Sequence, residues 1–591
     1  MNKTSEGAIS DQSILEELAR ILKSPIFAQS DRLARFLRFT IDQAISGNKD
    51  ALKEYAIGTE VYDRKPPYHP SQDSIVRTEA RRLRSKLKEY YETEGQNDPM
   101  FIYFRPGSYI PVFRSRDTLD HERPAELFID LPGVPIAVIP FANLSNSPIS
   151  ESCARGITDE LVHELSRTDG CRVIAMSSIA QPGLQVSDIP SLAQKLGVQI
   201  VFEGTVREEG GRIRVTARIV NADAFQLWSQ RFEAEADPAS LFKVQEQIAS
   251  ALISRVAPQQ SVIRKGKASA GPSILAVYPA TLAAEALLDQ GTVADVKAAL
   301  TKFEEVTKTA PGYARPYCGI AQCYYWMALR GTPHSADLAS HAKKAALHAM
   351  ELDPQMIEAH STLGGALTLE WDWSGAEASF IQALSLGTHA PTYRQYAIYL
   401  TALERFDEAW LYLQYAQQID PFSYRQKVAS ARFFFLSRRY DEGLDYVVTS
   451  VADAALPLEV RLYQALTYIK LGRHDDAKNM AQSLLRSVGA QPALRACLAE
   501  IFALCGEKSL ADKTTAEFNL LSPAAPISKF RQVLLSIASG NPKAALSLLS
   551  EAYADKEAEM PWLAVDPRFD SISKTTQCSE MIRDVRLGIS S

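Results

Sequence analysis

The sequence predicts a multidomain α+β protein with an N-terminal helical domain, a middle α/β sandwich and a C-terminal all-α repeat superhelix. Three observations support this prediction. The 591 residues exceed what one hydrophobic core organises, two stretches rich in charged or turn-forming residues interrupt the periodic patterning, and a 34-residue repeat runs through the second half. The expected domains are 1–115, 134–257 and 274–591, joined by linkers at 116–133 and 258–273.

Composition restricts the class of protein. With 46% hydrophobic and 23% charged residues the chain matches ordinary globular proteins, which excludes collagen-like, disordered and disulfide-scaffold classes. Its seven cysteines are scattered without a CxxC pair, so neither a disulfide framework nor a zinc site is expected. The sequence has no apolar signal core and no run of about 18 apolar residues. We therefore expect a cytoplasmic protein without membrane insertion.

Charge is unevenly distributed along the chain. The net charge is −6, yet residues 1–116 contain 19 Lys and Arg against 16 Asp and Glu. A local basic surplus attracts polyanions whatever the total charge of the protein. The N-terminal domain is therefore the segment expected to bind an anionic partner.

The N-terminal domain is predicted to contain four helices and a hairpin. The helices are expected at 13–24, 30–45, 52–63 and 77–91, and the hairpin at 101–113. In the last helix, apolar residues recur at steps of four and three, as in a helix packed on a small core. These residues are Val76, Ala80, Leu83, Leu87 and Tyr90.

Six cations lie off that apolar stripe. Four of them form an adjacent row and two lie on the outer face; in this order they are Arg77, Arg81, Arg84 and Lys88, then Arg82 and Lys86. Within the stretch only Glu79 and Glu89 oppose them, so pairing along the helix cannot neutralise most of the row. A surface for a polyanion is favoured. The alternative is a solvated helix face that bridges to the acidic middle domain.

The order of three helices and a hairpin, with the run ARRLRSKL followed by RPGSYIPVF, resembles the OmpR-type winged helix. The resemblance implies that the 77–91 helix enters the major groove of double-stranded DNA while the hairpin touches the backbone. The chemistry of the cations then separates groove residues from phosphate-binding residues. The groove set is Arg77, Arg81 and Arg82, and the phosphate set is Arg84, Lys86, Lys88 and Arg105. The 13–24 helix stands where that family has a small β-sheet.

The middle domain alternates strands and helices. A buried strand at 136–141 precedes a helix with Ile157, Leu161 and Leu165 on one side, then the strand CRVIA and the helix SLAQKLGV. The strands VQIVFEGTVRE and RIRVTARIVNA join at EGG, and QLWSQRFE closes a meander. The stretches IAVIPFANLS and GITDELVHELSR resemble the TolB-N/FlgO-like domain, which accompanies helical repeats in bacterial regulators and some cyclase-like proteins.

The C-terminal region is defined by its repeat. Small residues recur at steps of 34, with a single step of 33, at Ala342, Ala376, Ala409, Gly443, Ala477, Ala511 and Ala545. A second series lies at Gly364, Ala397, Ala431, Ala465 and Ala499. The pattern resembles the tetratricopeptide repeat over about residues 285–556, whose helical hairpins stack into a superhelix with a concave groove. The terminal MPWLAVDPRFDSI is expected to cap it.

The groove of such a superhelix implies a protein or peptide ligand. Residues of the first helices expected to face inward are Arg394, Arg425, Arg432 and Phe435. Ordinary surface and core packing is the alternative interpretation of these four side chains.

Other constellations predict no chemistry. DELVHEL lacks the second histidine of the zinc-protease spacing, and the heptad-spaced His334, His341 and His348 fit ordinary positions of the repeat. We therefore predict no catalytic residue, metal ligand or cofactor.

The combined domains resemble bacterial one-component regulators of the HilA and CadC types. The resemblance implies DNA binding and a partner- or signal-receiving repeat domain. Two alternatives remain: a protein-interaction scaffold that does not bind DNA, and an adenylate cyclase-related enzyme, because relatives with a cyclase domain share the middle and repeat regions. The oligomeric state stays open.

Overall fold

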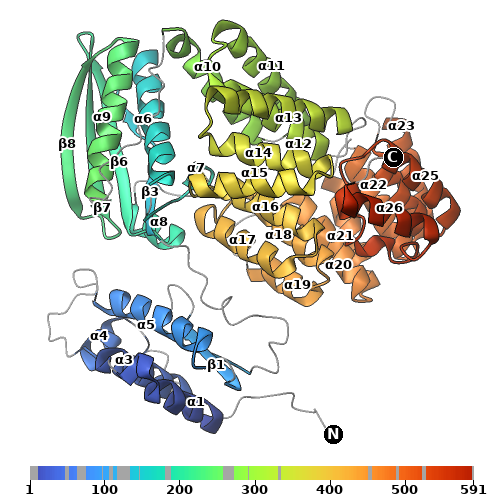
Figure 1. The fold of residues 1–591 in the computed structure, drawn as a ribbon, viewed down its shortest axis with the longest axis horizontal. Coiled ribbons are helices and arrows are strands. Elements are labelled where there is room, and N and C mark those ends of the chain that lie inside the picture. Colours follow the sequence, from blue (N-terminus) through green and yellow to red (C-terminus); the bar gives the residue numbers. More distant parts are fainter. Residues whose placement is uncertain are drawn as a thin grey trace. The chain divides into compact units, whose positions relative to one another are not determined.

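The computed structural model divides the chain into two compact units, Met1–Leu131 and Pro132–Ser591, shown in Figure 1. The structure describes residues 11–28, 30–46, 52, 54–62, 75–95, 98–104, 109, 111–115, 133–145, 147–168, 170–179, 188–256, 272–290, 292–329, 335–449, 456–487, 492–521 and 527–588. The division falls within the expected linker at 116–133. The predicted middle and C-terminal regions lie together in the second unit.

The first unit consists of helices followed by a two-stranded antiparallel hairpin. Its elements are α1 (Asp11–Lys23), α2 (Pro25–Ala28), α3 (Asp31–Ile45), α4 (Glu54–Glu60), α5 (Ile75–Glu92), β1 (Met100–Phe104) and β2 (Pro111–Ser115). The strands pair from Met100 with Ser115 to Phe104 with Pro111. The four helices and the hairpin that the sequence predicts are confirmed, and α2 is an additional short turn of helix.

The core of this unit is built on α5. The five residues of its predicted apolar stripe are at most 5% exposed, and they belong to one hydrophobic cluster with residues of α1, α3 and β1. Burial of this stripe fixes the rotation of α5 about its axis. The polar residues between the stripe positions must then point away from the core.

Phe36 of α3 connects three other elements of the unit. Its ring lies 5.9 Å from the Tyr62 ring after α4, and 6.4 Å from the rings of Phe104 in β1 and Tyr109 before β2. Aromatic pairs at these separations add to the stabilisation from burial. The middle of α3 is therefore held against both the end of α4 and the base of the hairpin.

One carboxyl group lies inside the same unit. Glu17 of α1 has a fully buried side chain, which accepts hydrogen bonds from Arg20 Nη2 at 2.6 Å and from the Tyr91 hydroxyl at 3.1 Å. Burial raises the pKa of Glu17 to about 7, although the hydrogen bonds from Arg20 and Tyr91 favour the charged form. This carboxyl therefore titrates close to neutral pH.

The second unit begins with a mixed sheet of six strands. They are β3 (Val134–Val138), β4 (Ala142–Asn143), β5 (Cys171–Val173), β6 (Ile200–Glu209), β7 (Arg212–Asn221) and β8 (Gln226–Glu235). The order is β5-β3-β6-β7-β8, with β4 also pairing with β6; the first three are parallel and β6, β7 and β8 are antiparallel. Gly210 and Gly211 turn β6 into β7 at φ 59° and 76°. The predicted hairpin and meander are confirmed.

Helices cover both faces of this sheet. They are α6 (Pro148–Ser166), α7 (Met176–Ile179), α8 (Ile189–Leu196) and α9 (Pro238–Val256). Leu161 of α6 and Ile248 of α9 share a cluster with Val215 of β7, whereas Leu192 of α8 packs with Val201 of β6 in another. The sequence patterns predict α6 and α8 but not α9.

The rest of the second unit is a series of helical hairpins (Figure 1). The helices are α10 (Pro272–Gln290), α11 (Val293–Thr309), α12 (Ala314–Leu329), α13 (Ser335–Leu352), α14 (Ile357–Leu369), α15 (Trp373–Leu386), α16 (Ala390–Ala402), α17 (Phe406–Ile419), α18 (Tyr424–Leu436), α19 (Tyr440–Thr449), α20 (Leu458–Lys470), α21 (His474–Ser487), α22 (Pro492–Leu504), α23 (Lys508–Leu521), α24 (Lys529–Ala538) and α25 (Pro542–Ala554). Even-numbered helices are the first and odd-numbered helices the second members of each hairpin.

The 34-residue series lies on the second helices, where its residues are buried. Ala376 and Ala409, for example, are 0% exposed. A Cβ on Gly443 would approach the Cβ of Phe434 in the preceding helix at 2.8 Å. Small residues at these positions therefore allow the two helices of a hairpin to approach closely, and the helical-repeat prediction is confirmed.

The middle domain is bonded to the repeats at several places. Arg315 at the start of α12 pairs with Asp159 of α6. Thr388, before α16, donates its N–H to the carbonyl of Ser166 at the end of α6 at 3.0 Å. Asp420, after α17, accepts hydrogen bonds from the hydroxyls of Ser177 and Ser178 in α7 at 2.8 and 2.6 Å. The sheet and the repeats are thus one packed body.

The chain ends in a non-repeat segment. Two 3-10 helices, Met560–Trp562 and Pro567–Phe569, precede the last helix α26 (Thr576–Leu587). Residues 557–588 are called the C-terminal segment below, and most of their apolar side chains are buried. None of the described helices combines the length and the apolar character that a membrane span requires.

Candidate functional site

Two surfaces carry the residues that the sequence singled out, and α5 presents the first. Arg82 projects from α5 with 67% of its side chain exposed, and Lys86 with 40%. Each has a partner on the same helix: Arg82 Nη1 lies 2.7 Å from Glu79 Oε1, and Lys86 Nζ lies 2.7 Å from Glu89 Oε2. The described cations of α5 are thus exposed and paired.

These pairings leave both cations accessible to an external anion. Exposed ion pairs three residues apart on a helix stabilise a protein by less than about 1 kcal/mol, because water screens them. A phosphate can therefore replace the exposed Glu89 beside Lys86 at small energetic cost, and it can bind Arg82 through the guanidinium nitrogens that face solvent. Glu79 differs from Glu89, since its side chain is 5% exposed and that of Glu89 is 51% exposed. Glu79 therefore holds Arg82 at a defined position near the core.

The other cations of the expected DNA surface lie on or near the same helix. The backbones of Arg77, Arg81, Arg84 and Lys88 belong to α5, while the positions of their side chains lie outside what the structure describes. Arg105, between β1 and β2, also lies outside the described residues. Their roles toward DNA stay predictions.

The second surface is the inner side of the repeats, where the structure shows contacts within the chain for the residues expected to line the groove. Arg432 and Phe435 of α18 contact the chain's own C-terminal segment. The Arg432 guanidinium lies 4.1 Å from the centre of the Trp562 ring, and the Arg568 guanidinium lies 5.9 Å from the centre of the Phe435 ring. Phe435 is 0% exposed. A distant part of the chain covers Phe435, as core packing, the alternative interpretation, expects, and its role toward a separate ligand stays a prediction.

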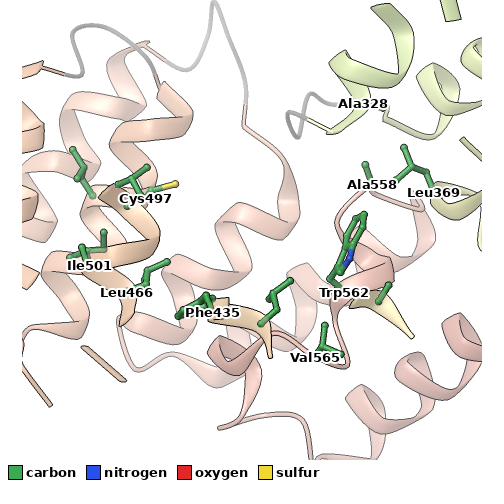
Figure 2. Packing of buried hydrophobic residues seen from close by; sticks show 14 of the residues in the cluster. Ala328, Leu369, Phe435, Leu466, Cys497, Ile501, Ala558, Trp562 and Val565 are labelled. Atoms are coloured by element: carbon green, nitrogen blue, oxygen red, sulfur yellow. The ribbon is translucent and has the colours of Figure 1, made fainter. Parts of the chain in front are cut away.

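Figure 2 shows the packing at this place, where Trp562, Val565 and Ala558 of the C-terminal segment lie in the same cluster as Leu369 and Phe435 of the repeats. Polar contacts complete it. The indole N–H of Trp562 donates to the carbonyl of Ile398 in α16 at 3.1 Å, and Lys470 of α20 donates to the carbonyl of Pro567 at 2.7 Å. The segment thus contacts helices from at least four different hairpins.

The two remaining groove residues are also engaged. Arg394 of α16 is only 7% exposed. Arg425 of α18 donates from Nη2 to the carbonyl of Leu288 in α10 at 2.8 Å. Packing within the chain, which was the alternative interpretation for these side chains, therefore describes both residues.

The C-terminal segment contains buried charged residues that pair with each other and with the repeats. Arg568 Nη2 lies 2.6 Å from Asp566 Oδ2, and its Nη1 lies 3.5 Å from Glu500 Oε2 of α22. Burial alone would raise the pKa of Asp566, but the adjacent Arg568 outweighs it and lowers that pKa below its ordinary value. The sequence predicts a capping element in MPWLAVDPRFDSI. Nothing in its spacing indicates that Arg568 contacts Glu500 of α22.

The motif DELVHEL also has a structural role. Asp159 accepts from Arg315 Nη2 at 3.1 Å, and the same nitrogen donates to Glu285 of α10 at 2.8 Å. Tyr278 of α10 donates its hydroxyl to Asp159 at 3.1 Å. Among the residues that the structure describes, no group of three or more His, Cys, Asp or Glu is arranged to hold a metal ion.

The middle of the chain is similar in sequence to known proteins. Residues 133–251 match the model of a family described as HilA/YgeH-like transcriptional regulator, second domain. The middle domain is similar to part of a regulator. Over 169 residues the chain is also 32% identical to "Putative adenylate cyclase 3" of Rhizobium meliloti (strain 1021), a stretch that covers 28% of this chain and 27% of that protein. The match thus spans about a quarter of that relative's length.

Solved structures resemble the chain only loosely. A human IFIT1 dimer with PPP-AAAA is 14% identical, with a TM-score of 0.37, over 59% of this chain and 80% of that one. The APC/C hetero-tetramer Cut9–Hcn1 is 15% identical, with a TM-score of 0.33, over 51% of this chain and 52% of that one. The helical-repeat assignment therefore depends on the hairpins and the buried 34-residue series themselves.

Proposed function

We propose that the chain is a DNA-binding transcription regulator whose N-terminal unit is a winged helix-turn-helix. The observation that carries the proposal is the match of residues 133–251 to the second domain of HilA/YgeH-like transcriptional regulators. The first unit supports it, because α5 is fixed by its buried stripe and exposes Arg82 and Lys86. Helices with cations on the outer face and a rigid apolar face suit the major groove of DNA.

In this proposal the cations of α5 and the hairpin have two roles, contact with bases and contact with phosphates. Residues early in the helix reach base edges, where arginine forks match guanine; these are Arg77, Arg81 and Arg82. Later residues and the hairpin hold phosphates, which position the protein without reading sequence; these are Arg84, Lys86, Lys88 and Arg105. Binding releases counterions from DNA, so the affinity should fall steeply with salt.

The repeat region is proposed to receive a protein partner or signal. The inner side already holds the C-terminal segment, so a separate partner would bind the outer surface, where the second helices expose apolar side chains. Leu347 of α13 is 42% exposed and Ile381 of α15 is 55% exposed. Isolated exposed leucines are common on proteins, so a partner must be sought by experiment.

The proposal is tested by measuring DNA binding of the full chain by fluorescence anisotropy over rising salt. The Arg81→Ala/Arg82→Ala/Arg84→Ala variant should lose affinity by at least tenfold and show a salt slope lower by about 1, from the phosphate contact of Arg84. The matched control removes three exposed arginines of the middle domain, Arg155, Arg207 and Arg231, and should bind like the wild type. Salt-independent or undetectable binding by the wild type would favour the protein-interaction scaffold instead.

The likeness to a protein named as an adenylate cyclase supports a second, weaker candidate function. It is tested by incubating the full chain with ATP and Mg²⁺ or Mn²⁺ and measuring cyclic AMP. We expect none above a heat-denatured control, because the similarity covers 27% of that protein. Steady formation of cyclic AMP that scales with protein concentration would support the enzyme.

A further inference from the structure

Helix α3 carries a row of arginines that the sequence analysis did not assign to any role. Its apolar side is buried in the core of the first unit through Leu33, Phe36, Leu37 and Ile41. On the other side, Arg32, Arg35 and Arg38 are all exposed. Residues three apart are neighbours on a helix surface, so these side chains follow one another along α3.

Arg35 has an interaction within the chain, so the other two arginines of the row are considered first. Asp31 lies four residues before Arg35, and Asp42 lies four residues after Arg38. Within the described part of the chain, Arg32 and Arg38 make no hydrogen bond or ion pair. An arginine whose fork is unpaired in the free protein keeps its donors available for an oxyanion.

The first two arginines of the row lie near Tyr62, which follows α4. Phe36, which lies between Arg35 and Arg38 in the sequence, packs on Tyr62 and on Tyr109 beside the hairpin. Burial raises the pKa of Tyr62, Glu79 of α5 adds to the rise, and Arg32 and Arg35 oppose it. Charges influence a titrating group in this way only from nearby. Arg32 and Arg35 therefore lie around the same phenol as Glu79, the residue that holds Arg82.

We propose that Arg32, Arg35 and Arg38 form a second phosphate-binding row, which holds the DNA backbone beside the strand contacted by α5. The inference rests on the proposed DNA-binding function and adds a surface to it. Three arginines over six residues of helix span about 9 Å at 1.5 Å per residue, whereas phosphates of one DNA strand are spaced about 3.4 Å along the axis. The row can thus meet two or three phosphates, and it should contribute equally to all DNA sequences.

The test compares salt dependence for a fluorescein-labelled random-sequence duplex, between about 50 and 200 mM salt. The variant is Arg32→Ala/Arg35→Ala/Arg38→Ala in the full chain, and the control is again Arg155→Ala/Arg207→Ala/Arg231→Ala. We expect the slope of log K against log salt to fall by about 2 to 3 in the α3 variant, with roughly tenfold weaker binding or more. The control should keep the wild-type slope.

A lysine version separates charge from folding. Arg32→Lys/Arg35→Lys/Arg38→Lys keeps three positive charges, so it should restore the wild-type slope, while thermal unfolding shows that all variants stay folded. If the wild type binds the duplex and the alanine variant binds with the same slope and affinity, the α3 row is not a DNA contact although the proposed function stands. If the wild type does not bind the duplex, the proposed function itself fails.

Discussion

The outer face of α5 and the inner face of the repeats were both predicted as binding surfaces, and they differ in what covers them. On α5, Arg82 and Lys86 remain exposed, and each pairs only with a neighbour on its own helix. On α18, Arg432 and Phe435 are covered by residues 130 or so positions later, around Trp562 and Arg568. A helical pattern tells which side chains leave the core of a small domain. It does not tell whether a distant segment will return to cover a concave surface.

The largest expected effect concerns the covered surface. Trp562 is 2% exposed and lies against Arg432, so Trp562→Ala should lower the free energy of unfolding of the second unit by about 3 to 5 kcal/mol. Denaturant unfolding followed by far-UV circular dichroism measures this loss. The control is Leu520→Ala in α23, where the side chain is 82% exposed and the change should stay within about 0.5 kcal/mol. Equal stabilities for both variants would mean that the C-terminal segment does not belong to the core.

A smaller effect, dependent on pH, is expected in the first unit. Because burial raises the pKa of Glu17 to about 7, the native state holds this proton more tightly than the unfolded chain, in which a glutamate titrates near 4.3. The resulting stability is fully present below the unfolded pKa and is lost as the pH rises through 7, to a total of about 3 kcal/mol at most.

Amide hydrogen exchange of α1 and α5 reports this change, because tryptophan fluorescence cannot: all six tryptophans lie in the second unit. Protection should decrease from pH 5 to pH 8 after correction for intrinsic exchange. In Glu17→Gln, which has no titrating group at this position, the corrected protection should vary less over the same range. The same pH dependence in both proteins would contradict the titration of Glu17.

The smallest expected effect concerns the exposed surface of α5. Arg82→Ala removes a pair whose arginine is 67% exposed, so the stability of the first unit should change by less than about 1 kcal/mol, while DNA affinity should fall. Measuring both quantities on one preparation distinguishes a binding residue from a structural one. A loss of several kcal/mol in stability would mean that Arg82 mainly supports the fold through Glu79.

Local patterns made most of the fold predictable. The stripe from Val76 to Tyr90, the Gly210–Gly211 turn and the 34-residue series each depend on neighbours in sequence or on one repeated contact, and the structure confirms them. Two features were not predictable in this way. The bond between Asp159 and Arg315, and the contact of Trp562 with Arg432, join residues more than 100 positions apart. Such contacts depend on which faces meet in space, and no single segment encodes them.

The bonds between the middle domain and the repeats have a mechanical consequence. Asp159, Ser166 and the serines of α7 are bonded at the starts or ends of α12, α16 and α17, so the sheet is attached to two separate hairpins, α12–α13 and α16–α17. A change in the curvature of the helical stack would strain these attachments together and would tilt the sheet as a rigid body.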